Sequence, residues 1–467
     1  MKKIITISLL LGSSLLTSSC EDKLFQEPQT SKVLNNFLRN ETESEEYVNA
    51  VYANLQNSGL YGLYLIAFSE IQSDNTYDEV PANDDGNYGQ LDQFSTIPNN
   101  AIVTAVWTQS YQAIQKANTV LNRIGSITYA TDATKQARIG EMKFIRALLY
   151  FNLVRLYGDV PLVTQETTDP NAYFGQGRTA STQVYDQMKK DLSEAISVLP
   201  ATTSQPGRVI KTAAQGLLAK VHLTLKSYTE AQTLLQAVVS SGQHTLMTNP
   251  ADVFSLSNEN NKEIIFAVQF ASGVNGNTEG STMFQQYAPS GTVSGAKGHN
   301  LPTKSLYALY SSADKRKGTY LTATSAGTPW SKKLTQPSVI TDGGSDVVVL
   351  RYADILLMLA EVQNELGNPG GAAATLNLIR TRAGLANTTA TAQSDLRTAI
   401  DLERRFELVG EGHRWFDLLR SGNAVSVMND WFNANNIQIR ITANNLLMPV
   451  PQGQVNTDPS IKQNPGY

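Results

Sequence analysis

Cysteine and histidine are scarce in this chain of 467 residues. There is one cysteine, Cys20, so no intramolecular disulfide and no multi-cysteine zinc or iron–sulfur site can form. The four histidines, His222, His244, His299 and His413, lie far apart, and none belongs to an H-x-x-x-H or H-E-x-x-H pattern. We therefore predict no metal site and no cofactor.

Charge of either sign is also sparse. The sequence has 37 Lys and Arg against 41 Asp and Glu, a net charge of −4. Charged residues make up 17% of the chain, compared with about 25% in typical soluble domains. Because there is no basic excess to neutralise phosphates, a nucleic-acid partner is disfavoured. The surface is expected to offer neutral hydrogen-bonding groups from Ser, Thr, Asn and Gln instead.

Long apolar runs are missing except at the start. Residues 4–16 are almost wholly apolar, but as a helix they span about 20 Å, less than the hydrocarbon core of a bilayer. Lys2-Lys3 before this run and small residues after it predict a signal peptide over 1–19. Cys20 then stands where a bacterial lipoprotein is lipidated, and 20–40 would be a tether. The alternative is an ordinary secretory signal in which Cys20 is incidental.

Helical patterns dominate the rest of the chain. Apolar residues recur at helical spacing over 101–123, 135–157, 181–198, 212–226, from Thr229 onward, and over 350–366, 370–383 and 393–410. The segments Thr42-x-x-Glu45 and Thr212-x-x-Gln215 are typical of capping boxes. Strand signals are few, over 263–270, 347–349 and 437–441.

Two of these helix pairs look alike. The segments "LAKVHLTLKSYTEAQTLLQAVV" and "LAEVQNELGNPGGAAATLNLIR" share small, aliphatic and alanine positions, and both resemble the tetratricopeptide repeat. We predict an all-α fold, a tetratricopeptide-repeat-like scaffold of helical hairpins with a few short strands. Two long stretches without regular patterns, about 69–100 and 271–346, are expected to be ordered loop insertions.

Three segments together resemble a known family. They are "EMKFIRALLYFNLVRLYGDVPLV" (141–163), "LRYADILLMLAEVQNELGNPGGAAATLNLIRTRAGL" (350–385), and "ERRFELVGEGHRWFDLLRSG" (403–422) with the closing "LLMPVPQGQVNTDPSIKQNPGY". The chain is similar to SusD/RagB-like nutrient-binding lipoproteins of the outer membrane. This resemblance implies one helical domain over 41–467, a cell-surface location and a lipid anchor in the outer membrane. It also implies a TonB-dependent, SusC-like transporter as partner, and an oligosaccharide or another nutrient such as a peptide as ligand.

The acidic residues Glu403, Glu407 and Glu411 fall on one helix face. Two of them could be the acid and base of a glycoside hydrolase, which need a separation of about 5–9.5 Å. Arginines alternate with them along the same segment, so a structural ion-pair network is favoured. We therefore predict a binding protein and not an enzyme, with peptide binding and hydrolysis as alternatives.

The two insertions carry the candidate ligand-binding residues. A sugar site needs flat aromatic faces for its C–H groups and polar side chains for its hydroxyls. The candidates are Asp74, Asn75, Tyr77 and Tyr88 in the first insertion and Tyr287, Tyr320 and Trp330 in the second. Trp330 is the leading platform because it alone among the tryptophans lies outside a helical pattern, whereas Trp107, Trp415 and Trp431 are expected in the core. The alternative for each aromatic is packing within its own loop.

Overall fold

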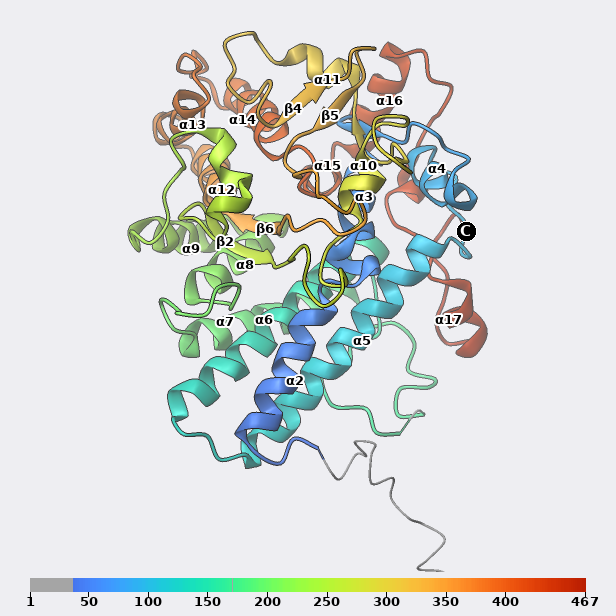
Figure 1. Cartoon of the computed structure of the whole chain (residues 1–467), viewed down its shortest axis with the longest axis vertical. Coiled ribbons are helices and arrows are strands. Elements are labelled where there is room, and N and C mark those ends of the chain that lie inside the picture. Colours follow the sequence, from blue (N-terminus) through green and yellow to red (C-terminus); the bar gives the residue numbers. More distant parts are fainter. Residues whose placement is uncertain (1–36, 170) are drawn as a thin grey trace, which may run out of the picture.

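A layered stack of helices forms the lower part of the molecule (Figure 1). The computed structural model describes residues 37–169 and 171–467, so the predicted signal peptide, Cys20 and most of the predicted tether lie outside the described residues. The first layers are α2 (Glu41–Asn54), α5 (Ala101–Arg123), α6 (Asp132–Tyr157) and α7 (Ser181–Val198). Apolar side chains surround α6 on nearly all sides, so this helix is buried along most of its length.

Helical hairpins continue the stack. They are α8 (Lys211–Thr224) with α9 (Tyr228–Ser240) and α12 (Tyr352–Glu365) with α13 (Pro369–Arg382), followed by α14 (Gln393–Leu408). These bounds agree with the predicted segments, and the mostly helical, tetratricopeptide-like fold is confirmed. Gly216 lets α8 approach its neighbours, since a Cβ there would lie 2.5 Å from a methyl carbon of Leu350.

The strands of the described chain form three antiparallel ribbons. They are β2 (Ile264–Val268) with β6 (Val347–Arg351), β1 (Thr76–Tyr77) with β3 (Leu301–Pro302), and β4 (Leu321–Ala323) with β5 (Pro329–Ser331). The predicted strand over 437–441 is wrong. The Asn429 side chain, and not a neighbouring strand, bonds both the N–H and the C=O of Ile441.

The two predicted insertions carry the remaining elements of the upper part (Figure 1). The first holds β1 and α4 (Asn87–Asp92), and the second holds α10 (Met283–Tyr287), β3, α11 (Lys304–Leu309), β4 and β5. The β1–β3 ribbon joins them, with Tyr77 opposite Leu301. The other helices of the chain's beginning and end are α3 (Tyr64–Glu70), α15 (Arg414–Ser421), α16 (Ala424–Ala434) and α17 (Gln452–Thr457), the last of which lies at the lower right in Figure 1.

Both predicted capping boxes are wrong. Helix α2 begins at Glu41, and its cap is Asn40, two residues before the predicted cap Thr42; Asn40 accepts the hydrogen bond from the Glu43 N–H. Helix α8 has no side-chain cap, and Thr212 lies inside it with its hydroxyl 2.9 Å from a ring nitrogen of His244. Asn is as good an N-cap as Thr, so the four-residue spacing alone did not fix the start.

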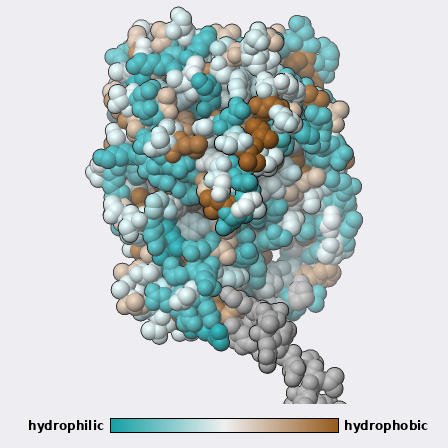
Figure 2. Space-filling model, viewed as in Figure 1, coloured by the Kyte–Doolittle hydropathy of each residue, from teal (hydrophilic) through white to brown (hydrophobic). Residues whose placement is uncertain are grey.

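One large apolar core runs through the stack. It contains buried side chains from α2, α5 to α9, β2, β6, α15 and α16. A smaller cluster fills the space between α12, α13 and α14. The outer face in Figure 2 is largely hydrophilic, with a few separate apolar patches. Within residues 37–169 and 171–467, no helix is long and apolar enough to cross a bilayer.

Candidate functional site

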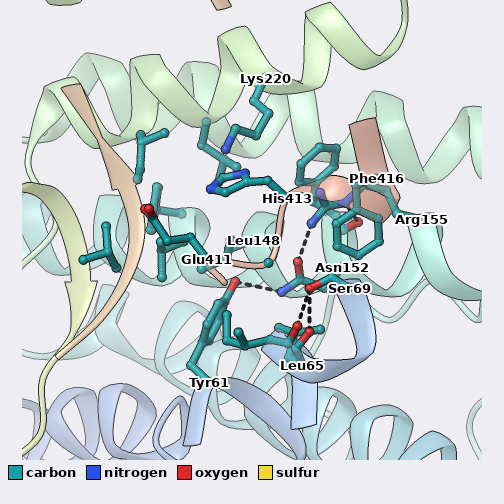
Figure 3. A pocket seen from close by; sticks show the side chains of 18 residues that line it. Tyr61, Leu65, Ser69, Leu148, Asn152, Arg155, Lys220, Glu411, His413 and Phe416 are labelled. Atoms are coloured by element: carbon teal, nitrogen blue, oxygen red, sulfur yellow. Dashed lines mark hydrogen bonds between the residues drawn. The ribbon is translucent and has the colours of Figure 1, made fainter. Parts of the chain in front are cut away.

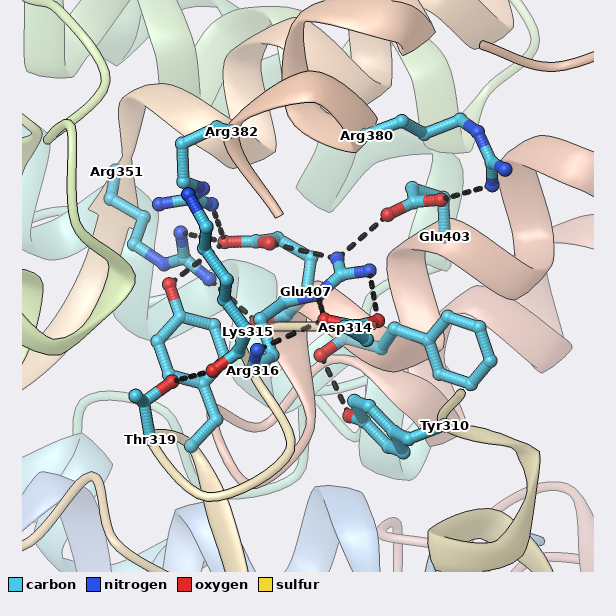
Figure 4. A network of polar contacts seen from close by, with 12 residues as sticks. Tyr310, Asp314, Lys315, Arg316, Thr319, Arg351, Arg380, Arg382, Glu403 and Glu407 are labelled. Atoms are coloured by element: carbon cyan, nitrogen blue, oxygen red, sulfur yellow. Dashed lines mark hydrogen bonds and ion pairs between the residues drawn. The ribbon is translucent and has the colours of Figure 1, made fainter. Parts of the chain in front are cut away.

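Glu407 lies at the centre of a buried ion-pair network (Figure 4). Its carboxylate is 2.7 Å from Arg351 Nη1 and 3.0 Å from Arg316 Nη1, and it also pairs with Arg382. Burial alone would raise the pKa of Glu407, but Arg382, Arg351 and Arg316 outweigh this effect and hold it well below its usual range. The carboxylate is thus a permanent anion that binds three elements together.

The other two glutamates of the motif belong to the same network. Glu403 contacts Arg316 at 2.7 Å and Arg380 at 3.0 Å, and Glu411 accepts from Arg351 Nε at 2.7 Å. None of the three carboxylates is exposed by more than 8%. The predicted ion-pair network is confirmed, and these groups have no free face to offer a substrate as acid or base.

Two of the predicted polar residues, Asp74 and Asn75, join an adjoining group of arginines. The Asp74 carboxylate accepts from Arg414 at 2.7 Å and lies 2.9 Å from Arg405. Asn75 accepts from Arg405 Nε at 2.9 Å. Both predicted residues are at least 97% buried, so they tie the first insertion to the C-terminal helices and have no contact with solvent to share with a ligand.

Three of the predicted aromatics are also buried. Tyr287 accepts from the Ala67 N–H and donates to the Leu63 carbonyl at 2.6 Å. Tyr320 is fully buried beneath the ion pairs, with Lys333 Nζ 4.4 Å from its ring centre. Tyr88 stacks on His299 and is 2% exposed. These three aromatics therefore agree with the alternative to ligand binding, which is packing among the loops, because neither face of any of the rings is open to solvent.

The internal cavities of the described chain are small. The one in Figure 3 has a volume of about 40 Å³ and lies between Asn152, Glu411 and His413. It has room for a few water molecules and no sugar ring. Burial, together with the charge of Lys220, lowers the pKa of His413 to about 3, so this imidazole is neutral and not a charged ligand-binding group.

An open pocket of about 290 Å³ lies where both insertions meet α16. Its apolar walls include the side chains of Tyr77 and Trp431, both partly exposed, above the buried Phe432. Phe432 supports Trp431 at 5.4 Å between ring centres. We call this space the Tyr77–Trp431 pocket, and it is an outward-facing site in which two aromatic side chains are available to a ligand.

Polar groups surround the aromatics of the Tyr77–Trp431 pocket, and one of them, Lys304, is a cation. Its polar lining residues are Asp92, Thr303, Lys304, Ser305 and Asn435. The indole N–H of Trp431 donates to the Ser305 hydroxyl at 3.3 Å, which fixes the orientation of the ring. Burial and then the charge of Asp78 raise the pKa of Asp92 to about 8, so at neutral pH its carboxyl is protonated. Aromatic faces beside hydroxyl, amide and uncharged carboxyl groups are suited to a polyhydroxylated ligand.

Among the predicted residues, the structure therefore brings Tyr77 alone into this pocket and adds Trp431, which the sequence assigned to the core. The helical pattern around Trp431 is real, since it lies in α16, but this helix is at the surface and its tryptophan is partly exposed. The run Asn433-Ala434-Asn435-Asn436 after it is the sequence signal that could have marked an exposed helix end. Trp107 and Trp415 are in the core, as expected.

Trp330, the leading predicted platform, lies elsewhere on the second insertion. It is on β5, partly exposed, with its ring 5.8 Å from that of Phe284 in an edge-to-face contact. It is not among the residues that line the Tyr77–Trp431 pocket. Its open face leaves it as a separate candidate contact.

A larger space of about 430 Å³ lies between the helical hairpins and the C-terminal helices. Its walls are ionic: Arg397 pairs with Glu365 at 2.6 Å, and Arg420 pairs with Glu361 and Asp417. We call it the charged groove. Because its arginines are already bound to carboxylates, it offers fewer free groups than its size suggests.

Comparison with protein families agrees with this architecture. A model of the SusD family matches residues 318–467, and a model described as starch-binding and associating with the outer membrane matches residues 27–223. The helical stack defines a protein of the tetratricopeptide-like fold class. The chain belongs to the SusD/RagB-like family of glycan-binding surface proteins.

Relatives align over almost the whole chain. A SusD-like protein of Formosa agariphila is 26% identical over 94% of this chain and 94% of its own length, and one of Bacteroides ovatus is 25% identical over 87% and 80%. A solved structure of a laminarin-binding SusD-like protein is 27% identical, covers 92% of this chain and all of its own, and superposes with a TM-score of 0.78. Surface glycan-binding protein A of Bacteroides thetaiotaomicron, solved with laminarihexaose, has the same fold at 22% identity and a TM-score of 0.78, with 91% and 99% covered.

Proposed function

We propose that this protein captures a glycan at the cell surface without cleaving it, and that the Tyr77–Trp431 pocket is a binding site for it. The observation that carries the proposal is this pocket, with its two partly exposed aromatic side chains among hydroxyl, amide and carboxyl groups and one ammonium, that of Lys304. Membership of a glycan-binding family and the laminarin-binding relative support it. The lining includes one partly exposed carboxyl, Asp92, that is uncharged at neutral pH, which suits an uncharged sugar.

We further propose that the mature chain begins at Cys20, that a lipid on this residue anchors it to the outer membrane, and that bound glycan passes to a SusC-like, TonB-dependent transporter. The sequence layout around Cys20 and the family supply the support. Metabolic labelling with a palmitate analogue tests the anchor, since Cys20→Ala should abolish the label. Affinity purification from membranes tests the partner, and a preparation without a β-barrel transporter would contradict it.

Affinity electrophoresis against a polysaccharide panel that includes laminarin and starch tests the ligand class. We expect retention by at least one glycan, and retention by none would overturn the proposal. Trp431→Ala should weaken binding to the retained glycan by about tenfold or more, since a stacking contact of this kind contributes on the order of 1 kcal/mol beyond its buried area. Trp107 is buried in the scaffold, so the conservative variant Trp107→Phe is the matched control and should leave affinity unchanged.

Peptide capture is the second candidate, and the charged groove is the observation that favours it, because helical repeats present such surfaces to peptides. Calorimetry with a mixed peptide digest separates the two, since heat from peptides that is lost in Arg397→Ala but kept in Trp431→Ala would assign the groove. Hydrolysis has a simpler test. Reducing-end assays on the retained glycan should show no turnover, and turnover would contradict the non-enzymatic proposal.

A further inference from the structure

A histidine joins the two insertions next to the β1–β3 ribbon. His299 is fully buried, and its Nδ1 lies 2.7 Å from an Asp78 oxygen while its Nε2 lies 2.7 Å from an Asp84 oxygen. Both partners are carboxylates, which accept and do not donate when ionised. With both carboxylates ionised, the ring satisfies both contacts at once only when both nitrogens carry a proton, which makes it an imidazolium between two anions.

Other groups complete this arrangement from each packed element. The ring of Tyr88, on α4, stacks on His299 with 3.6 Å between ring centres and 13° between planes. Lys297 Nζ lies 3.1 Å from the other Asp84 oxygen, on the outer side. Glu79 accepts the Ser290 N–H at 2.7 Å, a further link between the insertions. The charged neighbours of His299 are thus the two carboxylates that it contacts and one more distant ammonium, that of Lys297.

The histidine is coupled to the pocket through the backbone. Asp78 directly follows Tyr77, and His299 stands two residues before Leu301, which pairs with Tyr77 in the β1–β3 ribbon. The charge of Asp78 also acts on Asp92, a lining residue of the pocket. A change at His299 therefore acts on Tyr77, an aromatic lining residue of the pocket, and on Asp92, a polar one.

Of the two carboxylate contacts of His299, the one with Asp84 is the weaker, because of the turn in which Asp84 lies. Asp84 and Asp85 both have left-handed backbone, with φ of 49° and 57°, a conformation that residues other than glycine adopt only at some cost. The Asp84 side chain is 37% exposed and that of Asp78 is fully buried. Water can replace the histidine at Asp84 but not at Asp78, so a singly protonated ring keeps its proton toward Asp78 and releases Asp84.

We propose that His299 is a positioning residue whose protonation state controls the Tyr77–Trp431 pocket, so that glycan capture is strongest where the imidazole is doubly protonated and weakens as the pH rises. The proposal rests on the proposed function for its consequence, and on the Asp78–His299–Asp84 contacts for its mechanism. Loss of one proton frees the 84–86 turn and loosens the β1–β3 ribbon that positions Tyr77.

The mechanism is tested without any ligand. The chain, labelled with ¹⁵N-histidine, is titrated by NMR from about pH 5 to about pH 9, the range around which imidazole changes charge. The resonances of His299 are those missing from His299→Gln. We expect both ring nitrogens to be protonated at the acid end, and hydrogen exchange over 76–88, corrected for intrinsic rates, to rise as the second proton is lost. A ring that is singly protonated throughout would overturn the proposal.

The consequence is tested by calorimetry with laminarin over the same pH range. We expect affinity to fall by at least about threefold across the histidine titration, and the pH dependence to flatten in Asp84→Asn, which removes one carboxylate at the exposed end. His222→Gln, on α8 and away from both insertions, is the matched control and should keep the wild-type profile. A wild-type profile in Asp84→Asn would overturn the role of this contact.

The two levels of the proposal fail in different ways. If laminarin and every other glycan of the panel fail to bind at any pH while the NMR titration and exchange behave as expected, the proposed function fails and the histidine arrangement stands. If a glycan binds with an affinity that does not follow the titration of His299, glycan capture stands and the control by His299 is wrong. Should His299→Gln not fold, Asp84→Asn alone is the variant compared with wild type in both the NMR titration and the calorimetry.

Discussion

The helical stack and the insertion layer are held together by different chemistry. In the stack, long helices such as α6 bury aliphatic and aromatic side chains that need no specific partner. In the two insertions, which we call the insertion layer, elements are short and depend on polar contacts such as those of Asp74 and His299, and on Arg316, which joins the second insertion to Glu407 of α14. Hydrophobic packing tolerates change and follows a sequence period, whereas each ion pair requires one particular partner from a distant part of the chain.

The largest effect is expected from breaking the ion-pair network at its centre. Glu407→Gln leaves the buried guanidinium groups of Arg316, Arg351 and Arg382 without their shared anion, which should cost about 3–5 kcal/mol of unfolding free energy. Urea denaturation measures it. Glu365→Gln is the control, because its partner Arg397 is half exposed and the loss should stay below about 1 kcal/mol. Equal losses of unfolding free energy in Glu407→Gln and Glu365→Gln would contradict the contrast between the buried and the exposed ion pair.

A cavity in the stack should come next. Leu149 is fully buried in the middle of α6, so Leu149→Ala should lower the unfolding free energy by about 3 kcal/mol through lost transfer and cavity terms. No ionisable group is involved, and denaturation at about pH 5 and about pH 7.5 should give the same loss. A loss that changes with pH would show that the stack, too, depends on electrostatics.

The pH dependence of the unfolding free energy is expected to reflect Glu70, which lies in α3 beside the insertions. Burial raises the pKa of Glu70 from 4.5 to about 7, so between these values the folded chain holds a proton that the unfolded chain has released. Stability from this group is therefore present below about pH 4.5 and is lost as the pH rises to about 7, by on the order of 3 kcal/mol. Glu70→Gln should flatten this part of the curve of unfolding free energy against pH. An unchanged slope would remove Glu70 as its source.

The smallest effect on stability is expected at the surface of the insertion layer. Trp330 is partly exposed, and Trp330→Ala should weaken glycan binding while the melting temperature stays within a few degrees of wild type. Calorimetry with the retained glycan and a thermal melt give the two numbers. If affinity is unchanged, Trp330 does not belong to the binding surface, and the Tyr77–Trp431 pocket, which Trp330 does not line, stands without it.

The stack could be predicted from sequence because its signals are local. The helical period over 101–123 gave α5 with its bounds, and the repeat-like segments gave both hairpins. The site could not, because burial is decided by partners far away in sequence. Tyr320 looked available until Glu407 and Lys333 covered it, and Trp431 looked internal because its helix pattern does not show which face is covered. Tyr77 is the one predicted ligand-binding residue that lines the Tyr77–Trp431 pocket, and its role in binding stays a prediction.

The Tyr77–Trp431 pocket has a consequence for attempts to redesign specificity. Its walls come from 77–92, 303–305 and 431–439, three stretches that contribute separately and are joined in part by a ribbon only two residues long. Exchanging one loop with a relative would leave its cross-strand and ionic partners mismatched. Under the proposed function, transferring the ligand preference of this pocket to a relative requires all three stretches to be moved together.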